Sequence, residues 1–77
     1  MKNWLEKHLE YINKRDGTNL TIHQFNTKCG LTKNHLNKNV KKNVPIYNYT
    51  LSTLHAIAEG SNMVLSELLK MHDQRYK

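Results

Sequence analysis

The sequence predicts an all-α protein, a compact bundle of five helices in a single domain. The chain has 77 residues, which is enough for one small hydrophobic core and too few for a second domain. Its apolar residues recur at the three- and four-residue spacing of a helix face rather than at the two-residue spacing of a strand. Capping residues, glycines and one proline divide the apolar stretches into five segments.

The first helix is predicted over residues 2–15. Leu5, Leu9 and Ile12 fall on one face of such a helix, and the charged residues lie mostly on the opposite face. The turn-forming run at residues 16–19 (Asp-Gly-Thr-Asn) then ends the helix.

The second helix is predicted over residues 22–29. Thr21 can accept a hydrogen bond from the amide of Gln24, whose side chain can reach back to Thr21, and this is a capping-box arrangement. Gly30 is expected to end the helix, because glycine can adopt the left-handed conformation that a sharp turn between helices requires.

The third helix is predicted over residues 33–40, with Thr32 as its N-cap. Residues 41–49 are predicted to form a loop. Pro45 excludes a helix through this segment, since a proline pushes the residue before it out of the helical region.

The fourth helix is predicted to follow its N-cap Thr50 and to end at Gly60, and the fifth covers residues 64–71. The apolar residues expected to be buried on these two helices are Leu51, Leu54, Ile57, Ala58, Leu65, Leu68 and Leu69. Residues 72–77 are expected to be a polar C-terminal tail, so the folded domain is predicted to span residues 1–71.

Positive charge is concentrated in the middle of the chain. The formal net charge is +6 at neutral pH, and residues 17–58 contain no Asp or Glu. The lysines of this segment are Lys28, Lys33, Lys38, Lys41 and Lys42. A solvated surface usually mixes both signs of charge, so a block of one sign favours a polyanionic partner such as nucleic acid, although it also serves solubility.

The second and third helices together make a helix-turn-helix pattern. Phe25 and Leu36 are spaced to meet across the angle between the two helices, and Gly30 permits the turn. The outward side of the third helix is then able to enter a DNA major groove, which is about 12 Å wide. Four polar residues on this side suit contacts with base edges or phosphates: Lys33, Asn34, Asn37 and Lys38.

The run at residues 20–36 (Leu-Thr-Ile-His-Gln-Phe-Asn-Thr-Lys-Cys-Gly-Leu-Thr-Lys-Asn-His-Leu) resembles the helix-turn-helix of the lambda-repressor/Cro-type (XRE-like) regulators. Further along the chain, residues 50–58 and 65–69 resemble the fourth and fifth helices of that family, in the same order. The resemblance covers residues 4–70, and it implies a lambda-repressor-like DNA-binding fold in which helices two and three form the helix-turn-helix.

The resemblance also implies which residues contact DNA. In such regulators the start of the third helix and the positions one turn further on read bases, and here these are Lys33, Asn34, Asn37 and Lys38. The residues after the third helix and at the start of the second hold the phosphate backbone, and here these are Thr21, His23, Lys41, Lys42 and Asn43.

The function implied by the resemblance is sequence-specific transcriptional regulation by a cytoplasmic repressor of the phage or mobile-element kind. No signal peptide or membrane span is expected, because the apolar runs are short. One small domain makes few base contacts, so a homodimer on a palindromic double-stranded DNA operator is expected, with half-sites about 34 Å apart. The expected dimer surface is the fifth helix with the tail, where Met63, Val64 and Met71 are apolar.

The chain departs from the family's pattern at several positions. Asn26 stands where a small residue is usual, and Asn39 stands where an apolar residue is common, so Val40 is expected to take over that packing. The usual acidic partner of an arginine such as Arg15 would also fall at Val40, so that ion pair is absent. The loop at residues 41–49 is longer than the family's common form.

Two other functions are consistent with the same residues. The domain could be a protein-interaction module, an antitoxin or anti-repressor whose main partner is another protein, or its basic segment could bind DNA without sequence preference. An enzyme is not expected, because paired carboxylates, a Gly-rich phosphate loop and a Ser/His/Asp arrangement are all missing from the sequence. No cofactor is expected either.

Several chemically versatile residues are better explained by packing. The five histidines have no metal-ligand spacing, so no metal site is expected. Cys29, just before the turn glycine, is expected to be a small core residue rather than a nucleophile. Three aromatic residues at helical spacing are expected in the core: Trp4, Tyr11 and Phe25. Tyr47 and Tyr49 keep two interpretations, since they either close over the core or lie at a protein or DNA surface.

Overall fold

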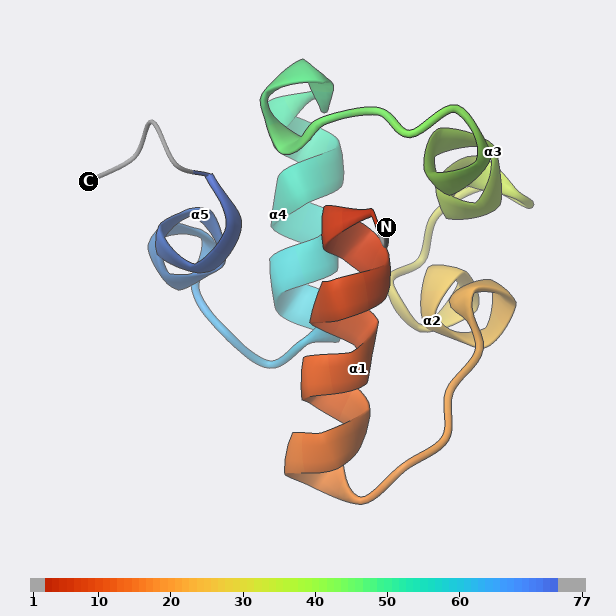
Figure 1. Ribbon diagram of the computed structural model, residues 1–77, viewed down its shortest axis with the longest axis vertical. Helices are drawn as coiled ribbons and strands as arrows, with labels where there is room; N and C mark the ends of the chain where they lie inside the picture. The colour runs from red at the N-terminus through yellow and green to blue at the C-terminus, as the bar shows by residue number, and fades with distance from the viewer. Residues whose placement is uncertain (1–2, 74–77) are drawn as a thin grey trace.

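The computed structural model describes residues 3–73, and over that part of the chain the protein is all-helical, with five α-helices, one short 3₁₀ helix and no strand (Figure 1). The elements are α1 (Trp4–Asp16), α2 (Ile22–Lys28), α3 (His35–Lys41), η1 (Ile46–Asn48), α4 (Leu51–Gly60) and α5 (Leu65–His72). None of the described helices is long and apolar enough to cross a membrane. Most of the tail predicted at residues 72–77 lies outside the described residues.

Side-chain caps determine where three of the helices begin. Asn3 and Glu6 form a capping box at the start of α1, which therefore begins later than predicted. Thr21 and Gln24 form the predicted capping box at α2, with their reciprocal hydrogen bonds at 3.2 and 2.9 Å. Thr50 caps α4, as predicted, by accepting a hydrogen bond from a backbone amide in the first turn.

The helices α1 and α4 lie at the centre of the molecule, with α2 and α3 on one side and α5 on the other (Figure 1). In this arrangement α2 packs against α1 and α3, and α5 packs against α4. Every α-helix contributes at least one fully buried apolar side chain to the core: Leu5, Ile12, Phe25, Leu36, Ile57 and Leu68. All of these side chains except Ile12 belong to one hydrophobic cluster.

Aromatic residues close one edge of the core. Trp4 packs edge-on against Tyr49, with ring centroids 5.1 Å apart, and Tyr49 is buried. Tyr49 therefore closes over the core, whereas Tyr47 is exposed at the surface. Tyr11 was predicted to lie in the core but is 42% exposed, and its ring lies 5.9 Å from the guanidinium carbon of Arg15 on the same helix.

The third helix begins and ends later than predicted. It starts at His35, and Asn34 rather than Thr32 is its N-cap residue. Asn34 has a φ of 63° and makes no side-chain capping hydrogen bond. The helix continues through Lys41, and the segment after it, predicted as an irregular loop, contains η1.

Two predictions on the last two helices are wrong. Leu51, predicted to be buried, is 65% exposed, because α4 reaches the core only from Thr53 and Leu54 onward. His72, predicted as the first residue of a polar tail, is the last residue of α5. Its ring packs against Trp4, with centroids 5.4 Å apart.

Candidate nucleic-acid interface

A short turn joins α2 to α3 and keeps α3 at the surface. Gly30, within this turn, has a φ of 73°, which is the left-handed conformation predicted for it. Phe25 on α2 and Leu36 on α3 are both fully buried in the same core cluster, as their spacing predicted. Val40, near the end of α3, also packs against this cluster, which is the packing expected of it.

Asn26 bridges α2 to the start of α3. Its side chain is 2% exposed, and its Nδ2 donates to the carbonyl of Thr32 at 2.8 Å. Its Oδ1 accepts from the amide of Leu36, also at 2.8 Å. The Oδ1 of Asn26 is therefore the acceptor that an N-cap side chain would have supplied, and its Nδ2 pairs with a backbone carbonyl of the turn.

The sequence pattern did not predict this role of Asn26, which stood out only as a departure from the family's pattern. The sequence offers one indication of this role: Asn26 is a polar residue directly after the core residue Phe25, at a helix position that faces the turn. A buried polar group requires a partner, and the backbone groups of a helix start are such partners.

The residues predicted to read bases are not all equally placed. Lys33 and Asn34 are exposed but lie in the turn before α3 rather than in its first turn, which corrects the predicted helix start. Lys38 is exposed on α3. Asn37 is half-buried, and its Oδ1 is covered and has no hydrogen-bond partner among the described residues. The exposed members of the predicted set are therefore Lys33, Asn34 and Lys38.

The residues predicted to hold phosphates are all exposed: Thr21, His23, Lys41, Lys42 and Asn43. Two of them have structural roles as well. The hydroxyl of Thr21 caps α2. The Oδ1 of Asn43 accepts from Nδ2 of Asn3 at 2.9 Å, so Asn43 ties the exit of α3 to the start of α1.

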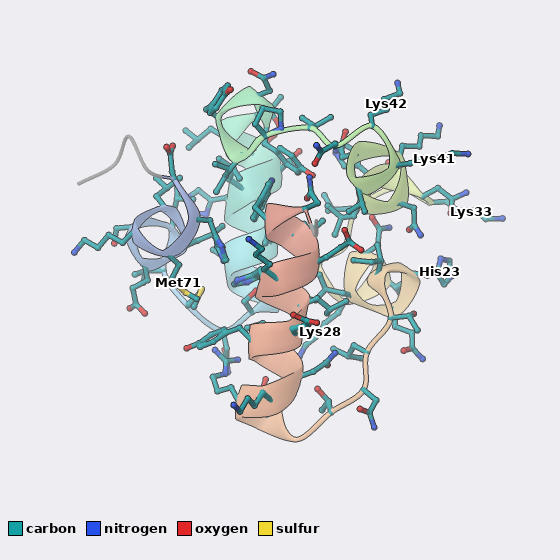
Figure 2. All side chains as sticks on the ribbon, viewed as in Figure 1. His23, Lys28, Lys33, Lys41, Lys42 and Met71 are labelled. Carbon is teal, nitrogen blue, oxygen red and sulfur yellow. The ribbon has the colours of Figure 1, made fainter. Side chains whose placement is uncertain are left out.

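Basic residues gather along the edge that α2 and α3 form. His23, Lys33, Lys41 and Lys42 project from this edge, on the side of the molecule away from α5 (Figure 2). We call these residues, together with Lys38, the basic edge. No acidic residue belongs to α2, α3 or the segments that join them to α4, so no carboxylate on these elements opposes the positive charge.

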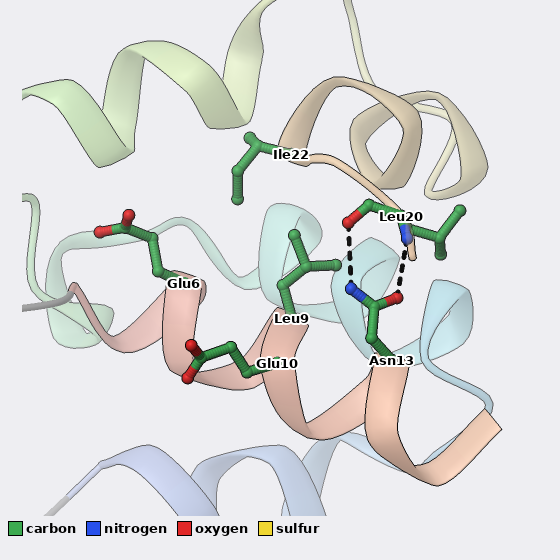
Figure 3. A pocket seen from close by; sticks show the side chains of 6 residues that line it. All are labelled: Glu6, Leu9, Glu10, Asn13, Leu20 and Ile22. Carbon is green, nitrogen blue, oxygen red and sulfur yellow. Dashed lines mark hydrogen bonds between the residues drawn. The ribbon is translucent and has the colours of Figure 1, made fainter. Parts of the chain in front are cut away.

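The connection between α1 and α2 is held by Asn13 (Figure 3). Its Nδ2 donates to the carbonyl of Leu20 at 3.0 Å, and its Oδ1 accepts from the amide of Leu20 at 2.9 Å and from the hydroxyl of Thr18 at 2.8 Å. Because these bonds fix the chain just before Thr21, they position the start of α2.

An open hollow of about 250 Å³ lies beside this connection (Figure 3). It is lined by Glu6, Leu9, Glu10, Asn13, Leu20 and Ile22. Its two carboxylates lie on α1 next to α2, and that of Glu6 accepts a hydrogen bond from the amide of Asn3 at 3.0 Å.

Arg15, which lacks its expected acidic partner, is paired elsewhere. Its Nε donates to the adjacent Asp16 at 2.8 Å, and its second terminal nitrogen donates to the carbonyl of Ser61 at 2.7 Å. The guanidinium joins the end of α1 to the end of α4. It therefore does not add to the positive charge of the basic edge.

Two histidines, His8 and His72, are in contact, with ring nitrogens 2.8 Å apart. Among residues 3–73 no group of three or more His, Cys, Asp or Glu side chains is placed to hold a metal ion. Cys29 is half-buried, and burial raises the pKa of its thiol to about 12, so the reactive thiolate is scarce at neutral pH. Comparison with protein-family models, curated proteins and solved structures found no match for this chain.

Proposed function

We propose that this protein is a sequence-specific, double-stranded DNA-binding transcriptional regulator of the lambda-repressor/Cro type. In this proposal α2 and α3 form its helix-turn-helix, and it acts as a cytoplasmic repressor of the phage or mobile-element kind. The observation that carries the proposal is the basic edge, an acid-free surface on a helix pair whose geometry is set by the buried side chain of Asn26. A polyanion with a groove wide enough for a helix is the partner that such a surface fits.

Three exposed residues, in the turn before α3 and on α3 itself, are proposed to read bases: Lys33, Asn34 and Lys38. A lysine can donate to guanine O6 and N7, and an asparagine can pair with both polar atoms of an adenine edge. Asn34 makes no capping hydrogen bond, so its carboxamide remains available for such a pair. Lys41 and Lys42, at the exit of α3, are assigned to phosphates, where each contact releases counterions.

A two-fold dimer is part of the proposal. The apolar surface of α5 that is offered to a second copy includes Val64, 58% exposed, and Met71, 41% exposed. Met63, also expected there, packs partly against the core and contributes less. In a dimer bound to a palindrome, the two copies of α3 are required to lie about 34 Å apart, one turn of DNA.

A binding selection tests the proposal. The full chain is incubated with a random-sequence duplex library, and we expect the retained duplexes to be enriched in a palindrome. On that duplex Asn34→Ala should cost about 1–3 kcal/mol and relax base preference at its position. Lys41→Ala should weaken binding to all duplexes alike and lower the salt slope by about one.

Lys14→Ala provides the matched control, because Lys14 is an exposed lysine on α1, outside the basic edge. It should leave base preference unchanged and weaken binding much less than Lys41→Ala does. Equal affinity for all duplexes would contradict sequence-specific binding and favour sequence-independent binding of DNA. Absence of DNA binding at low salt would favour the protein-interaction module.

A further inference from the structure

Three helices meet at a buried histidine pair. His8 on α1 is fully buried, and its Nδ1 lies 2.8 Å from Nε2 of His72, the last residue of α5. Its Nε2 lies 2.8 Å from Oγ of Ser61, the C-cap residue of α4. The pair is thus a polar joint between α1, α4 and α5, at a place where the rest of the core is apolar.

The hydrogen positions in this joint follow from Ser61. Its hydroxyl has one proton, which it donates to the carbonyl of Ile57 at 2.7 Å, so its oxygen accepts from His8 Nε2–H. The Nδ1 of His8 is then an unprotonated acceptor, and His72 donates to it through Nε2–H. Both imidazoles are neutral in this arrangement, and every short contact is satisfied.

An added proton meets unfavourable surroundings. Two cations act on the pair, Arg15 on His8 and Lys7 on His72. Burial, together with these charges, lowers the pKa of His8 from 6.5 to about 3 and also lowers the pKa of His72. An imidazolium at either ring is therefore disfavoured while the joint is closed.

The other ring neighbours of the pair are aromatic. Aromatic rings surround His8 from α1 and α2: Tyr11 and Phe25 each have centroids 6.2 Å from it. Trp4 covers His72. Of the carboxylates near these elements, Asp16 is bound to Arg15, and Asp73 is the buried C-cap residue of α5.

We propose that the His8–His72 pair is an acid-released latch, which frees α5 from α1 while α1 to α4 remain folded. The helix α5 has eight residues, and Leu68 is its one fully buried apolar side chain among those described. Leu65 and Leu69 are only partly buried. Of the elements described, α5 comes last in the chain, so it can detach without breaking the core that the other helices share.

The direction of the pH effect follows from the two states. When α5 is released, both imidazoles reach water and take up protons at their ordinary pKa near 6.5, whereas the closed joint takes them up only at lower pH. The released state therefore binds more protons below about pH 6 and is favoured as the pH falls. Above pH 7 the latch stays closed.

The consequence for DNA binding rests on the proposed function, although the release itself does not. Because Met71 lies on α5 and Val64 is its N-cap residue, release of α5 would remove the surface offered to a second copy. Acid would then dissociate the dimer and weaken binding to a palindrome, while leaving the basic edge folded.

Amide hydrogen exchange of the full chain, measured by NMR between pH 7 and 4.5, tests the latch. After correction for intrinsic exchange, the opening constant of α5 amides should rise at least tenfold per pH unit below about pH 6, one power of ten for each proton taken up. The amides of α2 and α3 should rise much less. His72→Gln should reduce the gradient to at most tenfold, and His55→Gln, at an exposed histidine of α4, should leave it unchanged.

The latch is contradicted if α5 and α2 amides gain the same pH dependence, because the molecule then opens as a whole. It is also contradicted if the wild-type gradient stays below tenfold per pH unit, a result that does not depend on any variant folding. The mass of the oligomer, recorded over the same pH range, separates the latch from the proposed dimer. Release of α5 with no change in mass would support the latch and rule out α5 as the dimer surface.

Discussion

At the scale of single residues, Asn26 connects the fold to the candidate site. Asn26→Ala would remove both of its hydrogen bonds and leave the buried amide of Leu36 without a partner. We expect the free energy of unfolding to fall by at least about 2 kcal/mol, as measured by urea denaturation. Asn19→Ala, at an exposed asparagine, is the control and should change stability by less than about 0.5 kcal/mol. Similar losses in the two variants would mean that Asn26 does not hold the turn.

Gly60 sets a second residue-scale constraint, since α4 and the end of α2 touch there. A β-carbon at this position would overlap Sγ of Cys29 and lie 3.2 Å from its Cα. In an exposed helix, Gly→Ala would stabilise by roughly 1 kcal/mol, but overpacking costs about 1–3 kcal/mol. We therefore expect Gly60→Ala to destabilise the protein.

The pairing with Cys29 makes this prediction specific. In a double-mutant cycle, Cys29→Ala should reduce the cost of Gly60→Ala, because it removes the sulfur that the new methyl meets. Thermal unfolding of the four proteins gives the comparison. A stabilising Gly60→Ala, or strictly additive effects, would show that the two elements are not in close contact.

At the scale of elements, the presence of each helix could be predicted from local sequence patterns, whereas some helix boundaries could not. The N-caps Thr21 and Thr50 were predictable because a capping residue and its partner lie within one turn. The start of α3 was not predictable, because the hydrogen-bond acceptor of its first-turn amide is Asn26, a residue of α2. The same limit applies at the candidate site: exposed Lys38 follows from the pattern, whereas the covered Oδ1 of Asn37 depends on tertiary packing.

The difference between a local cap and a tertiary one can be measured on two threonines. We expect Thr21→Ala to lower the free energy of unfolding by about 1 kcal/mol, as loss of a capping hydroxyl does. Thr32→Ala should have almost no effect, because Thr32 contributes its backbone carbonyl, which alanine retains. Thermal unfolding followed by circular dichroism compares them. Equal losses would restore Thr32 as the N-cap and move the start of α3 back toward Lys33.

At the scale of the whole molecule, charge and apolar surface are separated. The basic edge lies along α2 and α3, and Met71 on α5 lies on the opposite side of the molecule (Figure 2). The central helices α1 and α4 connect the two surfaces through one core. Such a separation allows one surface to bind a polyanion while the other binds a second protein chain, since neither partner covers the other's contacts.

Substitutions that place the same charge on different apolar sites test this separation. Val64→Glu puts a carboxylate on the surface of α5 proposed for a second copy, and Leu51→Glu puts one on an equally exposed leucine at the start of α4. Both change the net charge alike, so nonspecific attraction to DNA falls equally. We expect Val64→Glu to weaken self-association at least about tenfold, as loss of an interface anchor does, and to abolish cooperative binding to a palindrome while half-site binding persists. Sedimentation and gel-shift titrations measure both effects, and equal loss in the two variants would exclude α5 as the dimer surface.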